Sequence, residues 1–427
     1  MENKKLRPWC YHPFTNLTIE AGGKLRMCCA SMTHTVGEVN EISNIEDFWL
    51  NSPEMDVIRT DMLDHNLDGP ANLRDKCASC ISNESRGLHS KRQRYIEHFE
   101  MNRKDLIDQY MWEPKIRDMD LAFSRTCNFQ CATCSSAYSS KWFVDDRKRN
   151  KLKIVSRIPE IVDVIGINPL LKQDKVLQLS EIASRGAVSV IFKGGEPFLD
   201  SNFKYYQQNV KDKYNKTLSV VTNGSVYDEE LLDLLMEYRK VWITFSIDGI
   251  EDIHCWIRNS TKEQFENLLK NGRYIKGKNF VVNINSVISA FNIFTIDKLA
   301  EYLVNGDHEI ENINWFSFHA VVGRPFETAS LFLRTHQDII VQKLRLAAQQ
   351  FPEQTHAYQQ LNAAANHYSL PWQEIIPPHI YASKVRTFLI NYDNILVPSR
   401  GSYLEDHDEL FGEALFELRK YNAENPR

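Results

Sequence analysis

The sequence CNFQCATC at residues 127–134 places three cysteines in a C-x3-C-x2-C pattern. It follows a stretch in which Met119, Leu121 and Phe123 alternate with other residues, a pattern that predicts a strand. Three closely spaced thiolates can enclose one metal site but supply only three ligands. A structural zinc ion takes four ligands, whereas an iron–sulfur cubane held by three cysteines keeps one iron open. The loop therefore predicts a cluster with an open iron, and a zinc site is the alternative.

Downstream of this loop, apolar stretches rich in β-branched residues alternate with helical patterns. Helical spacing is seen at residues 262–275 and 295–303. Six strands alternating with helices predict a parallel sheet, open or curled into a partial barrel. Ligands of such folds gather at the carboxyl ends of the strands. The five strands predicted after the first lie at residues 188–192, 218–221, 241–247, 280–287 and 313–318.

Three short polar motifs follow successive predicted strands. They are Gly-Gly-Glu-Pro at residues 194–197, Thr-Asn-Gly at 222–224 and Ser-Ile-Asp-Gly at 246–249. Each motif alone is typical of a turn. In this order after the three-cysteine loop, however, the motifs form a specific pattern. Because of it, residues 116–325 resemble the radical S-adenosylmethionine (SAM) superfamily, and the resemblance implies a partial (β/α)6 barrel.

In that family the open iron binds the amino and carboxylate groups of SAM. The reduced cluster then cleaves SAM to a 5′-deoxyadenosyl radical, which abstracts hydrogen from a substrate. The resemblance implies a [4Fe–4S] cluster on the loop cysteines and a SAM site formed by the motif residues. The implied cluster ligands are Cys127, Cys131 and Cys134, and the implied SAM-binding residues are Gly194, Gly195, Glu196, Asn223, Ser246, Asp248 and Arg258.

The chemistry of the motif residues suits these roles. Gly194 and Gly195 have no side chains, so backbone can approach a ligand closely. Glu196 offers an acceptor to the ammonium group of SAM, and Ser246 and Asp248 offer acceptors to its ribose hydroxyls.

The remaining contacts to SAM are less specific. Asn223 is expected to bind ribose or carboxylate, and Arg258 to pair with the carboxylate unless it is an ordinary surface residue. The family commonly has an aromatic residue just before the third cysteine, where this chain has Thr133. Adenine contact is therefore expected from Phe129 or from backbone.

A second group of cysteines lies near the N-terminus. Its spacing resembles the twitch module, half of the auxiliary-cluster domain called SPASM, and that resemblance implies an auxiliary [4Fe–4S] cluster. A Gly-x4-Cys register selects Cys28 over the adjacent Cys29. A four-cysteine zinc site that staples a loop-rich domain is the alternative. The module precedes the barrel here, although it usually follows it, and its implied ligands are Cys10, Cys28, Cys77 and Cys80.

A few other residues are candidate functional residues that also have a simpler structural interpretation. Cys255 belongs to neither group and is either a hydrogen donor to a substrate radical, as an epimerase requires, or a buried apolar thiol. His319 and Arg324 follow the sixth strand and either face the substrate or serve structure. The basic run at residues 147–153 is expected to form a solvated helix face.

Composition sets the broad class of the protein. The 427 residues carry 51 Lys and Arg against 56 Asp and Glu, a net charge of −5 that argues against a broad nucleic-acid footprint. The sequence shows neither a secretory h-region nor a membrane-length apolar run, which predicts a cytoplasmic protein. In a reducing cytosol, the clustered thiols are expected to bind metal rather than form disulfides.

The sequence predicts three domains and one leading function. Residues 1–112 are expected to form the auxiliary-cluster domain, 113–325 the barrel and 326–427 a helical extension. We expect a radical SAM enzyme that oxidises a substrate through its auxiliary cluster and receives electrons from a flavodoxin or ferredoxin. A peptide or protein substrate is favoured over a small molecule, because the helical extension offers surface for a large partner. The alternatives are a redox-neutral epimerase with Cys255 as donor and a zinc-stapled binding protein.

Overall fold

The computed structural model describes residues 9–31, 34–85, 89–103, 113–152, 171–306, 308–311, 313–321 and 328–426. The chain forms two compact units. Unit 1 comprises Met1–Arg125, Asn168–Val220 and Glu230–Val241; unit 2 comprises Thr126–Ile167, Val221–Glu229 and Trp242–Arg427. The division into residues 1–112, 113–325 and 326–427 stays a prediction.

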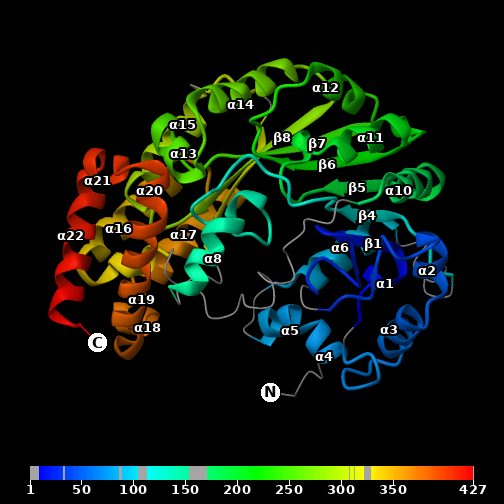
Figure 1. Cartoon of the computed structure of the whole chain (residues 1–427), viewed down its shortest axis with the longest axis horizontal. Helices are drawn as coiled ribbons and strands as arrows, with labels where there is room; N and C mark the ends of the chain where they lie inside the picture. The colour runs from blue at the N-terminus through cyan, green and yellow to red at the C-terminus, as the bar shows by residue number, and fades with distance from the viewer. Residues whose placement is uncertain are drawn as a thin grey trace. The chain divides into compact units, whose positions relative to one another are not determined.

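Unit 1 is built on strands in the order β3-β2-β1-β4-β5-β6. β4, β5 and β6 are parallel neighbours (Figure 1), and they confirm three of the strands expected from the sequence. Helices α10 (Gln173–Gly186) and α11 (Ser201–Asn209) flank β5 in the chain and pack on each other. The bounds are Asn16–Glu20 (β1), Lys24–Arg26 (β2), Gly37–Glu38 (β3), Asp118–Leu121 (β4), Ser189–Phe192 (β5) and Thr217–Thr222 (β6).

The N-terminal segment adds to this sheet. β1 runs parallel to β4, with Asn16 opposite Asp118, and β2 and β3 continue the sheet in antiparallel pairs. Every residue of β1 is buried. The cysteine-bearing segment is therefore joined to unit 1 by backbone hydrogen bonds and by its core.

This segment contains more helix than its turn-rich sequence suggests. The Asn44 side chain accepts from the Asp47 N–H at the start of α2, and the Ser52 side chain accepts from the Met55 N–H at the start of α3. Such caps stabilise short helices that have weak periodicity. The helices are α1 (His12–Thr15), α2 (Ile45–Asn51), α3 (Pro53–Leu63), α4 (Leu73–Lys76), α5 (Ala78–Ser85) and α6 (Lys91–Arg103).

Unit 2 contains strands β7 (Lys240–Ser246), β8 (Phe280–Ile288) and β9 (Ile313–Ala320) in that order. β8 and β9 are parallel. In both β7 and β8, buried residues alternate with partly exposed ones, the pattern of a strand with one face in the core. The predicted α/β class with parallel strands is confirmed.

The helices that follow β9 form the C-terminal part of unit 2, coloured yellow to red in Figure 1. α16 packs on α15 and α17, and α22 packs on α19 and α21. The helices predicted from the sequence are all present. The bounds are Phe143–Lys151 (α8), Glu251–Arg258 (α13), Lys262–Tyr274 (α14), Ile296–Asn305 (α15), Leu333–Gln349 (α16), His356–Tyr368 (α17), Pro378–Asn391 (α19), Val397–Arg400 (α20), Tyr403–His407 (α21) and Glu409–Glu424 (α22).

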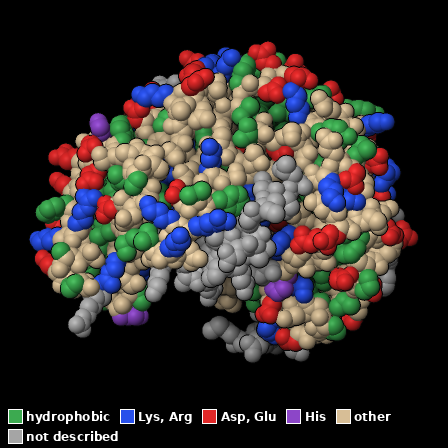
Figure 2. All heavy atoms as spheres, in the orientation of Figure 1, with side chains coloured by type: hydrophobic (Ala, Val, Ile, Leu, Met, Phe, Trp, Pro, Cys, Tyr) green, Lys and Arg blue, Asp and Glu red, His purple; other side chains and the backbone are tan. Residues whose placement is uncertain are grey.

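The described surface mixes charges of both signs. Figure 2 shows Lys and Arg side chains interspersed with Asp and Glu over the visible face, in keeping with the small net charge of −5. Among the described helices, none is long and apolar enough to cross a membrane.

Candidate functional site

The three-cysteine loop in unit 2 has irregular backbone that is held by hydrogen bonds from several elements. The Ala132 N–H donates to the Ile257 carbonyl of α13 at 2.6 Å, and the Trp142 indole N–H donates to the Cys131 carbonyl at 3.0 Å. Arg400 of α20 donates to the Gln130 carbonyl. A loop without ladder partners needs such bonds to satisfy its buried backbone. The C-terminal helices therefore take part in shaping the loop.

The loop also contacts the polar residues that follow β6. The Asn223 amide donates to the Asn128 side chain at 3.1 Å and lies 3.9 Å from the Cys127 sulfur. Asn128 in turn donates to the Ser225 hydroxyl at 2.8 Å. The sequence-predicted Asn223 therefore lies beside a predicted cluster ligand.

A buried ion pair lies next to the second cysteine. Arg258 and Asp248 form a 2.8 Å ion pair, and the Arg258 guanidinium lies 3.9 Å from the Cys131 sulfur. Burial raises the pKa of the Cys131 thiol, and the Arg258 charge opposes that rise. Asp248 also accepts the Val287 N–H at 2.8 Å. Both charged residues predicted from the motif are thus buried together, and Arg258 is a fixed cation beside the loop.

A second buried ion pair corrects the expectation that the basic run forms a solvated helix face. Arg149 and Asp146 pair at 3.0 Å with fully buried side chains, and Arg149 stacks on the Trp142 ring at 3.7 Å. Arg149 also donates to Asn391 of α19 at 2.8 Å. The run is not uniform, because packing of α8 against the C-terminal helices buries one of its members. Arg147 and Lys148 are exposed as expected.

Phe129 and Ser246 are the remaining predicted SAM-binding residues of unit 2. Phe129 is buried in the loop, where its carbonyl accepts the Ser139 hydroxyl at 2.6 Å. Ser246 ends β7 and is partly exposed.

The Gly-Gly-Glu-Pro segment lies in unit 1 after β5. Gly194 has φ +125°, and a Cβ there would lie 3.1 Å from the Ser124 carbonyl oxygen, so only glycine fits without strain. The Gly195 N–H donates to the same carbonyl at 3.2 Å. Glu196 is buried and accepts the Phe198 N–H at 3.0 Å. The segment is therefore a fixed turn with a buried carboxylate.

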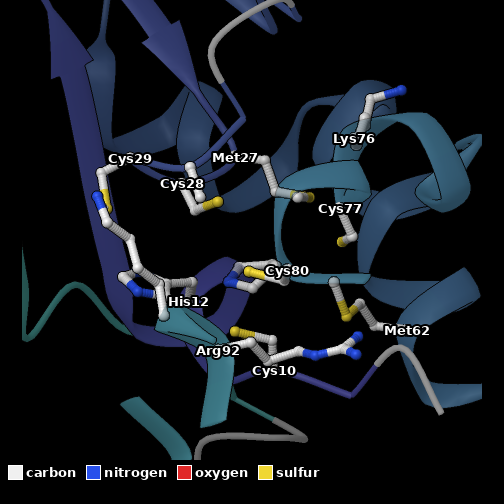
Figure 3. A pocket seen from close by; sticks show the side chains of 13 residues that line it. Cys10, His12, Met27, Cys28, Cys29, Met62, Lys76, Cys77, Cys80 and Arg92 are labelled. Carbon is white, nitrogen blue, oxygen red and sulfur yellow. The ribbon is translucent and has the colours of Figure 1, made fainter. Parts of the chain in front are cut away.

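Four N-terminal cysteines of unit 1 line one pocket, and Cys29 also borders it. Cys10 precedes α1, Cys28 follows β2, Cys77 caps α4 and Cys80 lies on α5. Figure 3 shows their sulfurs around one space, which Met27 and Met62 also border. Segments that are far apart in sequence therefore bring together the four thiols expected from the twitch pattern, and four thiolates saturate a [4Fe–4S] cluster.

The electrostatics of this pocket fit a cluster that displaces thiol protons. Burial, followed by the charges of Cys28, Cys77 and Cys80, raises the pKa of Cys10 well above its ordinary value. Burial raises the pKa of Cys28 to about 12 and that of Cys77 to about 11. Without metal, Cys10, Cys28 and Cys77 are therefore neutral, so cluster assembly releases their protons.

Cys29 differs from its neighbour Cys28. Its sulfur lies 3.8 Å from the Lys91 ammonium, and Asp120 and Lys193 are its other charged neighbours. The Cys28 sulfur instead accepts the N–H groups of Ala30 and Ser31, and its charged neighbours are Cys29 and then Cys77. Both thiols line the pocket but have different charged neighbours, and the choice of Cys28 as the ligand stays a prediction.

The four thiols are not arranged as ligands of a single ion. Within the described ranges, no three Cys, His, Asp or Glu side chains are placed to hold one metal ion. A cubane differs from such a site because each of its thiolates binds a different iron.

The remaining sequence candidates are Cys255, His319 and Arg324. Cys255 is half-buried, and its thiol interacts with Ser260 and with the charges of Asp252 and Lys262. His319 hydrogen-bonds to Ser317 at 2.6 Å and to Gln360 at 3.1 Å, which indicates a structural role in holding α17 to β9. Arg324 lies outside the described residues.

Sequence reasoning missed three residues that the structure places at the two cysteine groups. Arg92 of α6 lines the four-thiol pocket, whereas Arg149 and Arg400 support the three-cysteine loop. Arg149 lies seven residues after Trp142, a spacing that puts two side chains on one helix face. That spacing was the sequence signal from which the contact between them could have been predicted. Arg92 and Arg400 carry no comparable signal in the sequence.

Two family models match this chain. The model of the radical SAM superfamily matches residues 121–303, which include the three-cysteine loop and the three strand-end motifs. The model of the SPASM iron–sulfur cluster-binding domain matches residues 10–81, which include Cys10, Cys28, Cys77 and Cys80. These matches confirm the predicted partial-barrel class, the two kinds of iron–sulfur cluster and the use of SAM.

Curated relatives match part of the chain. The radical SAM cyclopropyl synthase TigE of Paramaledivibacter caminithermalis is 27 % identical over 214 residues, covering 48 % of this chain and 43 % of its own length. The S-adenosylmethionine-dependent nucleotide dehydratase RSAD2 of Oncorhynchus mykiss is 25 % identical over 178 residues, covering 40 % and 43 %. The chain thus spans less than half the length of these relatives.

Solved structures resemble the chain more distantly. The structure of anSMEcpe with bound AdoMet matches with a TM-score of 0.38 and 18 % identity. The match covers 54 % of this chain and 60 % of the anSMEcpe chain. Streptococcus suis SuiB bound to precursor peptide SuiA has a TM-score of 0.35 and 12 % identity, and covers 58 % and 52 %.

Proposed function

Since this chain is a radical SAM enzyme with an N-terminal SPASM-type iron–sulfur domain, we propose that it oxidises a peptide or protein side chain. The reaction begins with abstraction of a hydrogen atom from an unactivated C–H bond. SAM and its cluster supply the 5′-deoxyadenosyl radical for this step when they are bound. The protein's own residues bind and orient the reactants and exclude water.

We assign the loop cysteines of unit 2 to the SAM-cleaving cluster. Arg258 supplies a buried positive charge beside Cys131, and Asn223 supplies an amide beside Cys127. These groups stabilise negative charge on the cluster and on SAM. The proposed ligands are Cys127, Cys131 and Cys134, and the other proposed SAM-binding residues are Phe129, Gly194, Gly195, Glu196, Ser246 and Asp248.

The observation that carries the oxidation is the four-thiol pocket of unit 1. Cys10, Cys28, Cys77 and Cys80 supply one thiolate for each iron of a [4Fe–4S] cluster. A cluster without an open iron does not bind substrate directly and is suited to accept an electron. The substrate radical therefore gives up its electron to this cluster and a proton to its surroundings, which leaves a product oxidised by two electrons relative to the substrate.

The preference for a peptide or protein rests on the helical extension. Helices α16 to α22 follow the last strand and provide surface beyond the barrel. The names of the relatives do not narrow the substrate, because one is a cyclopropyl synthase and another a nucleotide dehydratase. A flavodoxin or ferredoxin is the proposed electron donor to the SAM-cleaving cluster.

The test is anaerobic reconstitution followed by counting of iron and sulfide. A triple variant with Cys127, Cys131 and Cys134 changed to Ala should lose about half of the iron and all formation of 5′-deoxyadenosine. A double variant, Cys10→Ala with Cys77→Ala, should also lose about half of the iron but should still cleave SAM. Wild-type protein that binds both clusters but makes no 5′-deoxyadenosine under reducing conditions would refute the proposal.

Turnover in deuterated water separates oxidation from a redox-neutral reaction. An oxidised product gains no solvent deuterium at the reacting carbon. Incorporation of deuterium that disappears in Cys255→Ala would instead identify an epimerase with Cys255 as hydrogen donor.

A further inference from the structure

Arg92 is held at the edge of the four-thiol pocket by a carboxylate. Its Nε donates to Glu84 Oε1 at 3.1 Å and its Nη2 to Glu84 Oε2 at 2.5 Å, a bidentate pair. Glu84 lies one turn after Cys80 on α5, and its Oε1 also accepts the Ser90 hydroxyl at 2.6 Å. The guanidinium is therefore fixed relative to a proposed cluster ligand.

The third nitrogen of this guanidinium, Nη1, has no hydrogen-bond partner in the part of the chain that the structure describes. Arg92 is only 5 % exposed, and its Nη1 is buried without a hydrogen-bond acceptor among the described residues. A buried N–H of a charged group that lacks an acceptor is costly, so native proteins rarely retain one. Arg92 lines the pocket together with the four thiols, and Figure 3 shows it beside Cys10.

The charges around Arg92 identify the groups that it faces. Glu84 is the main charged partner of Arg92, and Cys77 and Cys10 are its next electrostatic neighbours. The guanidinium thus lies within electrostatic reach of two of the four proposed cluster ligands.

We propose that Arg92 Nη1 donates a hydrogen bond to a sulfur atom of the auxiliary cluster, and that Arg92 thereby raises the reduction potential of that cluster. This inference rests on the proposed four-cysteine cluster in unit 1. The potential of an iron–sulfur cluster depends on nearby charge and on hydrogen bonds to its sulfurs. Because reduction adds a negative charge, a buried cation stabilises the reduced form. Arg92 is a positioning residue that makes the cluster a better acceptor of the substrate electron.

The first experiment compares midpoint potentials of the auxiliary cluster in the full chain with both clusters bound, by redox titration monitored with EPR. Added SAM perturbs the signal of the SAM-cleaving cluster and so identifies the auxiliary signal. We expect Arg92→Gln to shift the reduction equilibrium at least tenfold toward the oxidised cluster, about 59 mV for one electron. Arg92→Lys keeps the charge and should retain most of the wild-type potential.

The matched control is Arg74, which forms the same bidentate pair with Asp68 on the surface of unit 1. Both of its bonds are 2.7 Å, and its side chain is 54 % exposed. Arg74→Gln should change the equilibrium less than twofold. A full auxiliary cluster in Arg92→Gln with the same midpoint as the Arg74→Gln control would overturn the inference.

The second experiment needs no variant that might lose its cluster. Wild-type protein labelled with 15N in its arginine guanidinium groups should show a 15N coupling to the reduced auxiliary cluster in pulsed EPR. Absence of that coupling would overturn the inference even if Arg92→Gln fails to bind iron. If the wild-type protein contains iron for only one cluster, the proposed function fails first, and the iron count distinguishes that result.

Discussion

Arg149→Met tests whether the ion pair buried beneath the three-cysteine loop keeps that loop closed. Arg149 and Asp146 are both fully buried and lie 3.0 Å apart. Asp146 also accepts the Ser136 N–H at 2.7 Å, just after the third cysteine. Methionine fills a similar volume but leaves the Asp146 carboxylate buried without its cation.

The size of the effect follows from the loss of the cation. Breaking a buried ion pair by removing one partner costs about 3–5 kcal/mol. The stacking of Arg149 on Trp142 is also lost, which adds about 1 kcal/mol. If only about 3 kcal/mol of this total acts on local opening of the loop, the open fraction rises roughly a hundredfold, because each 1.4 kcal/mol is a factor of about ten.

The assay is the rate at which a ferrous chelator removes iron from the reconstituted enzyme. Iron release should have two phases, and the triple variant of Cys127, Cys131 and Cys134 shows which phase belongs to the SAM-cleaving cluster. That phase should accelerate about a hundredfold in Arg149→Met, whereas release from the auxiliary cluster should stay unchanged. Asp146→Asn added to Arg149→Met removes the unpaired charge and should recover part of the loss.

Arg147→Met is the matched control, since Arg147 lies on the same helix and is exposed. It should leave both phases of iron release within about twofold of wild type. An Arg149→Met enzyme whose release rates equal those of Arg147→Met would refute the claim that the buried pair secures the loop.

Two further predictions concern the choice of Cys28 over Cys29 and a histidine that the sequence did not select. Cys28→Ser should lower the iron bound by the auxiliary site, and Cys29→Ser should leave it at the wild-type level; equal losses in both variants would contradict the assignment. Burial, reinforced by the charge of Arg258, holds the pKa of His254 well below its usual value. The folded protein therefore binds fewer protons than the unfolded one, and stability should fall by up to about 1.4 kcal/mol per unit as pH drops below about 6.5. His254→Leu should flatten the dependence of the urea unfolding midpoint on pH below about 6.5. An unchanged slope would rule out the mechanism.

The sequence predicted the six strands and the main helices correctly because their signals are local. Buried residues alternate along β7 and β8, and the helical spacing of apolar residues marks α14 and α15. The three strands of the N-terminal segment were not predicted. Pairing of β1 with β4 joins residues about a hundred positions apart, and no local pattern encodes such a register.

The candidate site likewise has features that the local sequence predicted and features that it did not. Cysteine spacing determined which residues are suited to hold iron, because three thiols within eight residues must lie close together in any fold. The sequence likewise placed Gly194 after a strand, where its φ of +125° explains the need for glycine. These inferences depend on atoms joined by a short piece of chain.

Only the tertiary structure decided which neighbours surround those thiols. It gave Cys28 and Cys29 different charged neighbours, buried Arg149 in a basic run that looks solvated, and fixed Arg92 against Glu84 in the lining of the thiol pocket. Burial and electrostatic partners come from segments distant in sequence, so residue type and spacing do not determine them. The sequence therefore determined the proposed cluster ligands, and packing decided the charges that act on them.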